Sequence, residues 1–422
     1  MLKVLIAMFR DLLTFDQAKN VVQQHFKPKP LGVETIPLLD ACNRVLAENV
    51  TATLDIPPFN RSTVDGYAVK AEDTFGAYEN RPVKLKICGT VNVGQLSKIT
   101  VTRGKSAEIV TGAPIPDGAD AVVMVENAER NDDDLYVHSA VSTDENTMKA
   151  GADIRKGETV LREGRLLGSR EIGVLAALGT IRAKVYSLPR VAVLSTGAEI
   201  TEPGKGLSSG KIYDINAYSL SAAVTESGGK PVYLGVFPDE ATTLQKTLKQ
   251  ALASADMVIT SGGVSVGPTD VMPKTLDSLG KPGVIICGIA IKPGKPTTVA
   301  LIDGKLIFSL PGHPTSALLV FHLLARPIIQ RMAGEETSKS LMIKAITAVR
   351  LFPAKGRRTF IMVKLKRKRS DRFVAEPVPT GLSGAITTLA KADGFVEIAE
   401  NQQFIDAHEE VAVHLFKSPE EA

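Results

Sequence analysis

The turn Ser261-Gly262-Gly263-Val264-Ser265-Val266-Gly267-Pro268-Thr269-Asp270 directly follows an apolar run at 257–260, and it decides the fold class. A short apolar strand that ends in a glycine-rich turn is typical of α/β sheets, where the turn exposes backbone N–H groups beside the next helix. Two similar turns follow, Lys292-Pro293-Gly294-Lys295-Pro296-Thr297 and Leu310-Pro311-Gly312-His313-Pro314-Thr315. Their lysines, together with Asp270, indicate a phosphate-bearing ligand and a hard metal ion.

Strand and helix signals alternate around this turn, from about residue 189 to 334. Short apolar runs predict buried strands at 191–194, 232–236 and 257–260. Asn216 and Asp239 are expected to cap two helices that carry an apolar face. The alternation predicts a three-layer α/β domain, a mostly parallel sheet with helices on both faces.

Ligands bind such sheets at the carboxyl ends of the strands, which is where the polar turns fall. Glu199 lies in the turn after the first strand, and Asp270 ends the glycine-rich turn. Asp239 follows the second strand, so three acids would meet at one edge of the sheet and hold Mg²⁺. For Asp239 a purely capping role is an equally good interpretation.

The flanking regions have different patterns. At the N-terminal end, Thr14 and Gln17 predict a capping box, and a second short helix is expected to start with Ser169 as N-cap. Residues 182–190 read as a linker, and 131–134 as a hairpin tip rather than a calcium loop. The region from about 67 to 148 predicts a β-rich domain, with strands at 83–88, 106–110, 121–125 and 135–141.

The C-terminal region, about 340–422, is again strand-rich. Residues 350–372 carry ten basic residues and one acid, Asp371. Because Phe360 and Met362 alternate with charged residues, a solvated hairpin is favoured. A basic wall beside an anionic ligand stays the alternative.

Composition narrows the class of protein further. A chain of 422 residues needs several domains, and a formal charge of +4 gives little support to a nucleic-acid binder. Three cysteines without a C-x-x-C pair favour a reducing, cytoplasmic setting. The longest apolar candidate, 316–329, contains His322 and Arg326 and predicts a core helix rather than a membrane span.

Taken together in order, the motifs resemble one known family. The resemblance is carried by 58–69, 111–114, 151–154, 195–199 and 212–216 together with the three turns, and it covers roughly residues 11 to 415. Each motif alone is weak, but the ordered set is specific. The chain resembles the MoeA family of molybdopterin molybdenumtransferases, which also includes the E domain of gephyrin.

The resemblance implies four domains and a homodimer. An elongated, discontinuous N-terminal helical domain would comprise 1–50 and 152–188, and an inserted β-rich domain 51–151. The α/β molybdopterin-binding domain, similar to molybdopterin adenylyltransferases, would comprise 189–334, and a C-terminal β-barrel-like domain 338–422. The active site would lie between the α/β domain of one subunit and the N-terminal half of the other.

The implied reaction belongs to molybdenum cofactor biosynthesis. Molybdate or tungstate would be inserted into adenylylated molybdopterin with release of AMP, in the presence of Mg²⁺. A molybdopterin adenylyltransferase and molybdoenzyme apoproteins are the implied partners, with no nucleic acid and no membrane. The alternatives are an adenylyltransferase that uses ATP, which the additional domains argue against, and a non-catalytic carrier or scaffold.

The resemblance also assigns site residues. Metal ligands would be Glu199 and Asp270. Catalytic residues would be Glu199, Asp270, Asp153, Asp239, Lys292 and Lys295. Substrate-binding residues would be Asn60, Ser62, Asp65, Thr111, Gly112, Ser195, Thr196, Gly197, Ser261, Gly262, Gly263, Ser265, Gly267, Pro311, Gly312 and His313.

Three positions depart from the family pattern. Asn60 stands where many members have an aspartate, and an amide neither takes a proton nor ligates as a carboxylate does. Ala198 replaces a common acid, and His313 a common asparagine. No sequence criterion separates molybdate from tungstate.

Overall fold

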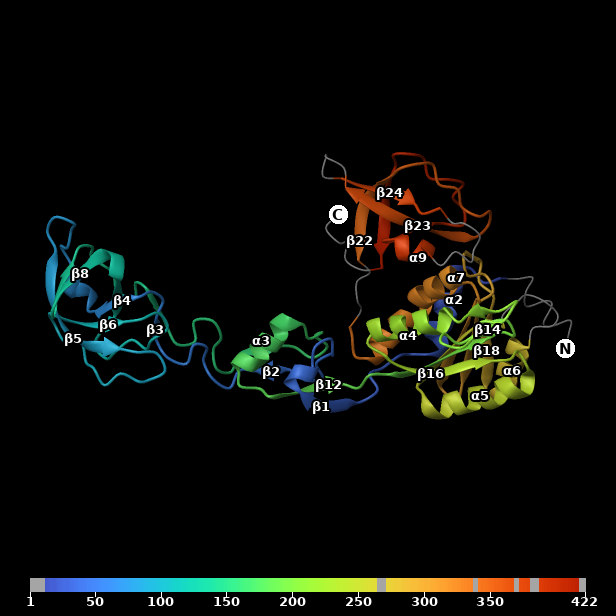
Figure 1. Ribbon diagram of the computed structural model, residues 1–422, viewed down its shortest axis with the longest axis horizontal. Coiled ribbons are helices and arrows are strands. Elements are labelled where there is room, and N and C mark those ends of the chain that lie inside the picture. Colours follow the sequence, from blue (N-terminus) through green and yellow to red (C-terminus); the bar gives the residue numbers. More distant parts are fainter. Residues whose placement is uncertain (1–11, 264–270, 337–340, 368–371, 380–386, 417–422) are drawn as a thin grey trace.

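The computed structural model describes residues 12–263, 271–336, 341–367, 372–379 and 387–416. Within them the molecule is elongated (Figure 1). A β-rich arm (residues 61–148) lies at one end, and a narrow neck (33–51 and 159–186) connects it to the rest. An α/β layer (190–332) and a barrel (342–415) form the other end. The chain therefore passes through the neck twice.

The arm is built on a six-stranded sheet with the order β7-β4-β6-β5-β9-β8. Its strands are β4 (Gly66–Val69), β5 (Val83–Val91), β6 (Lys105–Ile109), β7 (Ala121–Met124), β8 (Ala128–Asn131) and β9 (Asp134–Val137). The four strands predicted in this region are thus confirmed, with shifted ends. Asn131 pairs with Asp134, so the predicted hairpin tip is confirmed as well.

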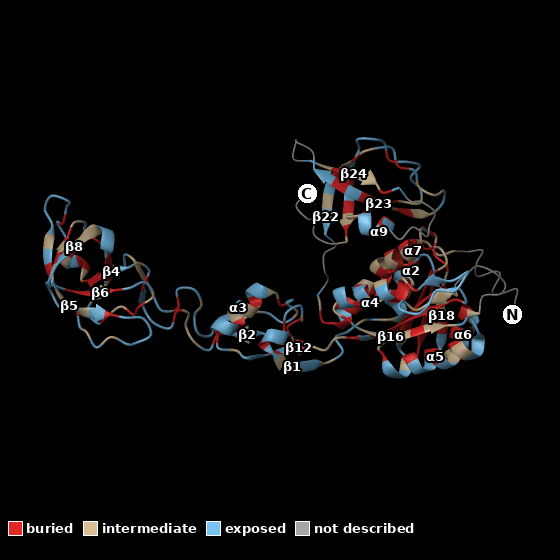
Figure 2. Ribbon diagram, in the orientation of Figure 1, coloured by how far each residue is buried: buried red, intermediate tan, exposed pale blue. Residues whose placement is uncertain are grey.

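Short elements complete the arm. The pair β3 (Arg61–Ser62) and β10 (Thr147–Met148) closes its base. Single 3₁₀ turns occur at η2 (Ala71–Thr74) and η3 (Val125–Asn127). Apolar side chains fill both faces of the sheet, around Val123 and Leu135 on one face and Val122 and Ile109 on the other. The arm therefore has a core of its own (Figure 2).

The neck consists of two small antiparallel sheets and one helix. Its elements are β1 (Val33–Pro37), η1 (Leu38–Asp40), β2 (Val50–Thr51), β11 (Thr159–Leu161), α3 (Ser169–Ala177) and β12 (Arg182–Tyr186). Strand β1 pairs with β12, and β2 with β11. The prediction of a linker at 182–190 was therefore wrong for β12, because its side chains alternate between exposed and buried against Leu46 and Leu175. The prediction of Ser169 as N-cap was also wrong: Gly168 is the cap, and its N–H donates to Glu171 Oε2.

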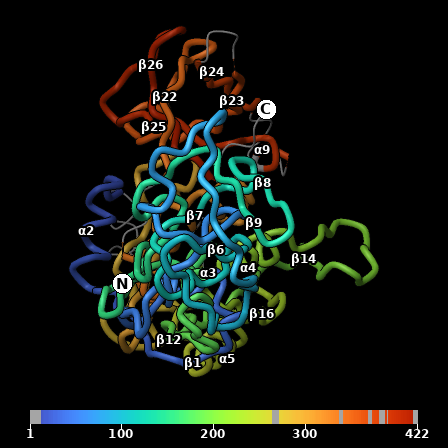
Figure 3. Tube along the Cα trace, turned by 90° about the vertical axis from the view of Figure 1, so that its left-hand side faces the viewer, coloured from blue at the N-terminus to red at the C-terminus, as the bar shows by residue number. Residues whose placement is uncertain are grey.

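The α/β layer confirms the mostly parallel sheet, in the order β16-β13-β17-β21-β20-β18. Its strands are β13 (Arg190–Thr196), β16 (Lys230–Phe237), β17 (Met257–Ser261), β18 (Pro282–Cys287), β20 (Thr298–Ile302) and β21 (Lys305–Leu310). Strands β16, β13, β17 and β21 run parallel, whereas β20 and β18 are antiparallel to their neighbours. A further short pair, β14 (Ile200–Thr201) and β15 (Ile212–Tyr213), begins and ends a segment that projects from the side of the molecule (Figure 3).

Helices cover both faces of this sheet. They are α4 (Asn216–Glu226), α5 (Ala241–Ser254), α6 (Met272–Leu279), α7 (Pro314–Val320) and α8 (Arg326–Met332), with a π-helical turn, η4 (Phe321–Ala325), between the last two. Alternate residues of β13 face opposite cores: Val191 and Val193 pack with α4, α7 and α8, and Ala192 and Leu194 pack with α5 and α6. The apolar run at 316–329 is thus core, as predicted, and no helix of the described residues is long and apolar enough to cross a membrane.

Two predicted caps in this layer were wrong. Helix α4 begins at Asn216 itself, and the Asp214 carboxylate receives the hydrogen bond from Ala217 N. Helix α5 begins at Ala241 with Glu240 as N-cap, and no side-chain cap is present. Asp239 is therefore not used by the helix.

The first helix, α2 (Phe15–His25), has the predicted capping box between Thr14 and Gln17. Its buried side chains Phe15, Ala18 and Val22 belong to the core of the α/β layer. By packing, α2 is therefore separate from the neck, although it precedes residue 50.

The C-terminal region is a closed β-barrel. Its strands are β22 (Met342–Thr347), β23 (Arg358–Arg367), β24 (Phe373–Pro377), β25 (Gly394–Ile398) and β26 (Glu410–Leu415), and the short helix α9 (Thr387–Lys391) lies beside them. The order β23-β24-β22-β26-β25 closes through the pairing of β25 with β23. The solvated hairpin predicted within 350–372 is only partly correct: β23 lies in this stretch, but its partner β24 begins at Phe373, and Phe360 and Met362 are buried. Strand β19 (Ile291–Lys292) pairs with β23 and joins the barrel to the layer below.

Candidate active site

Four parallel strands end at the same edge of the α/β sheet, and each is followed by a turn with predicted site residues. Thr196 pairs with Phe237, Ser195 with Ser261, and Ser261 with Leu310, so the ends of β13, β16, β17 and β21 are level. The residues that follow them are therefore neighbours. They are Ser195, Thr196, Gly197 and Glu199; Asp239; Ser261, Gly262 and Gly263; and Pro311, Gly312 and His313.

A hydrogen-bond network between buried side chains holds these turns together. Asn216 Nδ2 donates to Ser261 Oγ and to the Gly312 carbonyl, both at 2.7 Å. Ser195 Oγ donates to Asp214 Oδ1 at 2.8 Å, the oxygen that also receives Ala217 N. Asp214 and Asn216 thus connect the start of α4 to three strand ends.

Sequence reasoning gave these two residues no role in the site. The run Ile212-Tyr213-Asp214-Ile215-Asn216 was only part of the family resemblance, and Asn216 was interpreted as a helix cap. Their burial to below a tenth exposed, with partners on other strands, is visible only in three dimensions.

The glycines allow a close approach between the turns. A Cβ on Gly262 would lie 2.2 Å from the Thr196 carbonyl oxygen, and the φ angle of Gly262 is +96°. A Cβ on Gly263 would lie 2.9 Å from Thr196 Oγ1 and 3.0 Å from Asp239 Oδ1. The turn after β17 therefore requires glycine, and it brings Asp239 next to Thr196.

Two carboxylates at this edge have the chemistry to hold a hard cation. Asp239 and Glu199 are both exposed, and Glu199 folds against Gly197. Thr196 Oγ1 is buried and has no hydrogen-bond partner within the described residues. Mg²⁺ is usually held by one or two carboxylates plus phosphate oxygens and water, so this donor set fits it. No group of three or more His, Cys, Asp or Glu side chains suited to a metal occurs in the described part of the chain.

Three predicted site residues, Ser265, Gly267 and Asp270, lie outside the described residues. The proposed pairing of Asp270 with Glu199 at a metal ion therefore stays a prediction.

The two predicted lysines lie between the layer and the barrel. Lys292 pairs with Thr359 in β19–β23, and the turn after it is closed by Thr297 Oγ1, which donates to the Gly294 carbonyl at 2.7 Å. Lys295 and Arg357 line one cavity of about 580 Å³. Arg357 belongs to the basic stretch 350–372, so part of that stretch does face a cavity with a predicted site lysine.

The other predicted residues form a second cluster on the arm. Asp65 Oδ1 receives Thr111 N at 2.6 Å and Thr111 Oγ1 at 2.7 Å, and these bonds hold the pKa of Asp65 below its usual range. Ser62 accepts at its carbonyl from Gly112 N at 2.8 Å, while its hydroxyl donates to the Val64 carbonyl. The cluster is therefore an ordered turn built around a charged carboxylate.

At the base of the arm, Asn60 Oδ1 receives Ala150 N at 2.9 Å. Asp153 is exposed, and its N–H donates to the Ile56 carbonyl at 3.0 Å. The neck separates both residues, and the arm cluster, from the sheet edge (Figure 1). A single chain thus does not bring the two sets of predicted residues together.

Comparison with known proteins agrees with this architecture. The family models "MoeA N-terminal region (domain I and II)", "Probable molybdopterin binding domain" and "MoeA C-terminal region (domain IV)" match residues 13–179, 192–331 and 344–416. A molybdopterin molybdenumtransferase from Haemophilus influenzae is 32% identical over 407 residues, which cover 96% of this chain and 99% of the relative. The chain belongs to the MoeA family.

Other MoeA relatives support the same assignment. The Bacillus subtilis molybdopterin molybdenumtransferase is 34% identical and covers 88% of this chain and 87% of its own length. A solved structure of the MoeA molybdopterin biosynthesis protein from Pyrococcus horikosii is 40% identical, with a TM-score of 0.81, and covers 97% of this chain and 100% of the other. The family resemblance predicted from the ordered motifs is therefore confirmed, and with it the class of transferase.

Proposed function

We propose that this MoeA chain inserts molybdate or tungstate into adenylylated molybdopterin, with release of AMP and with Mg²⁺, in molybdenum cofactor biosynthesis. The observation that carries the proposal is the convergence of glycine-rich turns and carboxylates at one edge of the α/β sheet. Both substrates are anions, and such an edge offers backbone N–H groups and positive charge to anions.

The oxyanion end of the site is assigned to the lysines. Lys292 and Lys295 are held by a turn that is tied to β23, and Lys295 shares its cavity with Arg357. Charge-assisted hydrogen bonds from such groups to a tetrahedral oxyanion are about twice as strong as neutral ones. Lys292 and Lys295, aided by Arg357, would therefore bind molybdate or tungstate.

The nucleotide end of the site is assigned to the turns after β13 and β17. Gly262 and Gly263 leave room for phosphate oxygens, and Thr196 Oγ1 is available as a donor to them. Glu199 and Asp239, with Asp270, would hold Mg²⁺, which supplies charge neutralisation at the phosphoanhydride. Asp214 and Asn216 keep the turns in register.

The arm cluster would complete the site of a second subunit. Within one chain Asp65 and Thr111 are far from the sheet edge, so a homodimer in which the arm of one protomer reaches the layer of the other would unite them (Figure 1). In such a dimer Asn60 acts as a hydrogen-bonding amide rather than as an acid or base, since its Oδ1 is already used by Ala150 N.

Partners and location follow from the reaction. An adenylyltransferase would deliver the nucleotide-bearing substrate, and molybdoenzyme apoproteins would receive the product. None of Cys42, Cys88 and Cys287 forms a disulfide bond, which fits the reducing cytoplasm.

The test is AMP release from adenylylated molybdopterin, with molybdate and tungstate titrated separately in the presence of Mg²⁺. Oxyanion-dependent release, with a product that activates a molybdoenzyme apoprotein, supports the proposal. Consumption of ATP with free molybdopterin would support an adenylyltransferase, and tight binding without turnover a carrier.

A mixing experiment tests the shared site. Asp65→Asn impairs only the arm and Glu199→Gln only the sheet edge, so an equal mixture of two inactive variants should regain about a quarter of the native activity, because half of the dimers are mixed and carry one intact site each. No recovery after subunit exchange would mean that each site is made by one chain.

A further inference from the structure

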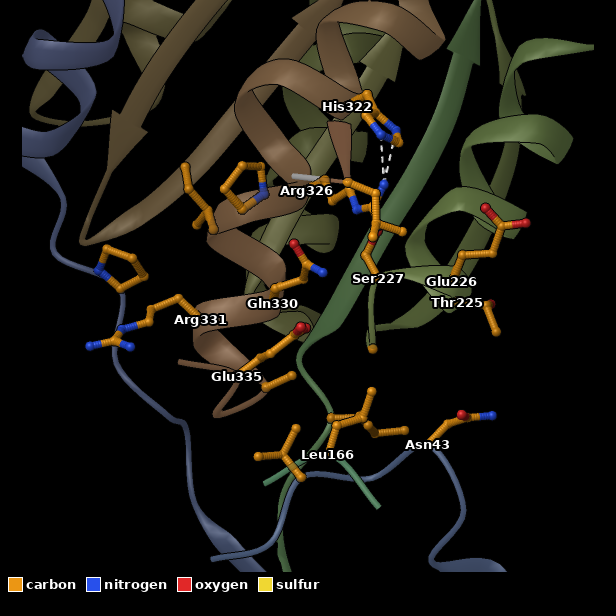
Figure 4. A pocket seen from close by; sticks show the side chains of 18 of the residues that line it. Asn43, Leu166, Thr225, Glu226, Ser227, His322, Arg326, Gln330, Arg331 and Glu335 are labelled. Atoms are coloured by element: carbon orange, nitrogen blue, oxygen red, sulfur yellow. Dashed lines mark hydrogen bonds between the residues drawn. The ribbon is translucent and has the colours of Figure 1, made fainter. Parts of the chain in front are cut away.

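A large cavity lies away from the sheet edge, where neck, α/β layer and barrel meet (Figure 4). It measures about 950 Å³, which is within the range of pockets for small organic ligands. None of the residues assigned above to the active site lines it. Its walls come from α2, the neck, the end of α4, α8 and the last barrel strand.

Two nitrogen-bearing side chains face this cavity from one turn of helix. His322 belongs to the π-helical turn η4, and Arg326 is the first residue of α8. One guanidinium nitrogen of Arg326 lies 2.6 Å from His322 Nε2 (Figure 4). π-helical turns of this kind are frequent at functional sites, because they displace side chains from the regular helical positions.

The imidazole of His322 is neutral. Burial, and secondly the positive charge of Arg326, lower the pKa of His322 to about 4. The ring therefore accepts a hydrogen bond from Arg326, and an edge-on contact with Phe416 at 5.1 Å fixes its orientation. This bond uses one of the five guanidinium N–H donors and does not compensate the charge of Arg326.

No carboxylate of the described residues forms an ion pair with Arg326. Burial lowers the pKa of Arg326, whereas the attraction of Glu335 and Glu226, which line the same cavity without pairing with it, opposes this shift. A guanidinium stays charged in proteins, and a half-buried charge without a counter-ion is costly. The cavity thus presents a cation whose natural complement is an anion.

The remaining walls carry Glu226, Arg331 and Glu335, but their larger part is apolar and defines the rest of the ligand. The apolar side chains include Val22, Phe26, Leu166, Leu188, Leu415 and Phe416. We propose that this cavity binds a small organic anion, with its carboxylate-like head on Arg326 and an apolar body against Leu166, Leu415 and Phe416. Such a ligand would contact the neck, the layer and the barrel at once.

The experiment measures octanoate binding to the full-length protein, through displacement of the fluorescent sulfonate 8-anilinonaphthalene-1-sulfonate. Octanoate should displace the dye, and 1-octanol, with the same chain and no charge, should do so at least about tenfold less well. Arg326→Gln should weaken octanoate binding by about tenfold or more, because it removes the charge and the fork of donors. Arg170→Gln, an exposed arginine of α3 that does not line the cavity, is the matched control and should bind octanoate as the unchanged protein does.

Two outcomes would overturn the proposal. Equal displacement by octanol and octanoate would mean a purely apolar void, and unchanged binding by a folded Arg326→Gln variant would place the anion elsewhere. If that variant does not fold, the octanoate and octanol comparison on the unchanged protein decides alone. Absence of octanoate binding at this cavity would leave AMP release unaffected, so the two proposals are tested separately.

Discussion

Asn216 and Ser261 are joined side chain to side chain across the sheet edge, with Asn216 Nδ2 2.7 Å from Ser261 Oγ. The same amide nitrogen also reaches the Gly312 carbonyl at 2.7 Å. Because both acceptors sit in turns assigned to substrate binding, this one side chain sets the spacing of two turns that come from strands 44 or more residues apart in sequence.

Asn216→Ala should therefore affect both stability and activity. Loss of two buried hydrogen bonds is expected to cost about 1–3 kcal/mol of unfolding free energy and to lower AMP release by about tenfold or more. Denaturant unfolding and initial rates measure the two effects. Ser219→Ala on the same helix, which loses only a bond to the Asn216 backbone carbonyl, is the control. Full activity in a folded Asn216→Ala variant would contradict the assigned role.

Gly262→Ala tests the close approach of the two turns. The new methyl group would meet the Thr196 carbonyl at 2.2 Å, and the φ of +96° disfavours any side chain. We expect destabilisation by about 1–3 kcal/mol and loss of most AMP release. Gly206→Ala, where a Cβ meets nothing within 4 Å, should leave both quantities unchanged. Equal behaviour of the two variants would show that the turn adjusts freely.

Glu171 makes the stability of the neck depend on pH in a defined way. Hydrogen bonds from Arg165 first, and from backbone N–H groups, lower the pKa of Glu171 to about 2. Because the folded pKa lies below the unfolded value of 4.5, the stabilisation is complete above the unfolded pKa and is lost as the pH falls towards 2. The stability difference between the native chain and Glu171→Gln should thus shrink between about pH 5 and pH 2. Thermal unfolding of both proteins across this pH range measures the stability difference. A difference that stays constant with pH would contradict the ion pair between Glu171 and Arg165.

Arg358 connects the first helix to the barrel. Its guanidinium contacts Asp16 at 2.7 Å, Glu400 at 3.0 Å and Glu397 at 3.2 Å, and only 14% of its side chain is exposed. Arg358→Ala should cost about 1–3 kcal/mol, since it removes charge-assisted hydrogen bonds to three partly exposed acids and leaves them near one another. Arg350→Ala breaks only exposed contacts, the ion pair with Asp406 and a cation–π contact with Phe404, and should cost about 1 kcal/mol or less. If chemical denaturation shows a similar loss of unfolding free energy in both variants, Arg358 does not stabilise the contact between the first helix and the barrel.

Local signals in the sequence predicted much of the fold. The strands at 191–194, 232–236 and 257–260 are present within β13, β16 and β17, because continuous apolar runs of that length suit a sheet covered on both faces. The capping box at Thr14 is equally local and was also correct. The caps at Ser169, Asn216 and Asp239 were misplaced by one or two residues, since several capping residues stand side by side and only the backbone geometry chooses between them.

Long-range relationships were harder to predict. The capping box of α2 was predicted, but which core the helix joins depends on side chains more than 150 residues away. The roles of Asp214 and Asn216 were missed for the same reason, because their partners lie on other strands. The separation of Asp65 and Thr111 from the sheet edge follows from the length of the neck, which no residue pattern reports.

The packing of α2 has a consequence for synthesis on the ribosome. This helix is made before the neck and the arm, yet it rests on β18 and on Phe360, whose ring lies 5.5 Å from that of Phe15. The arm, with its own core, is able to fold as soon as it emerges, whereas α2 must wait until nearly the whole chain has been translated. During that interval its apolar face is open to chaperones and to other nascent chains.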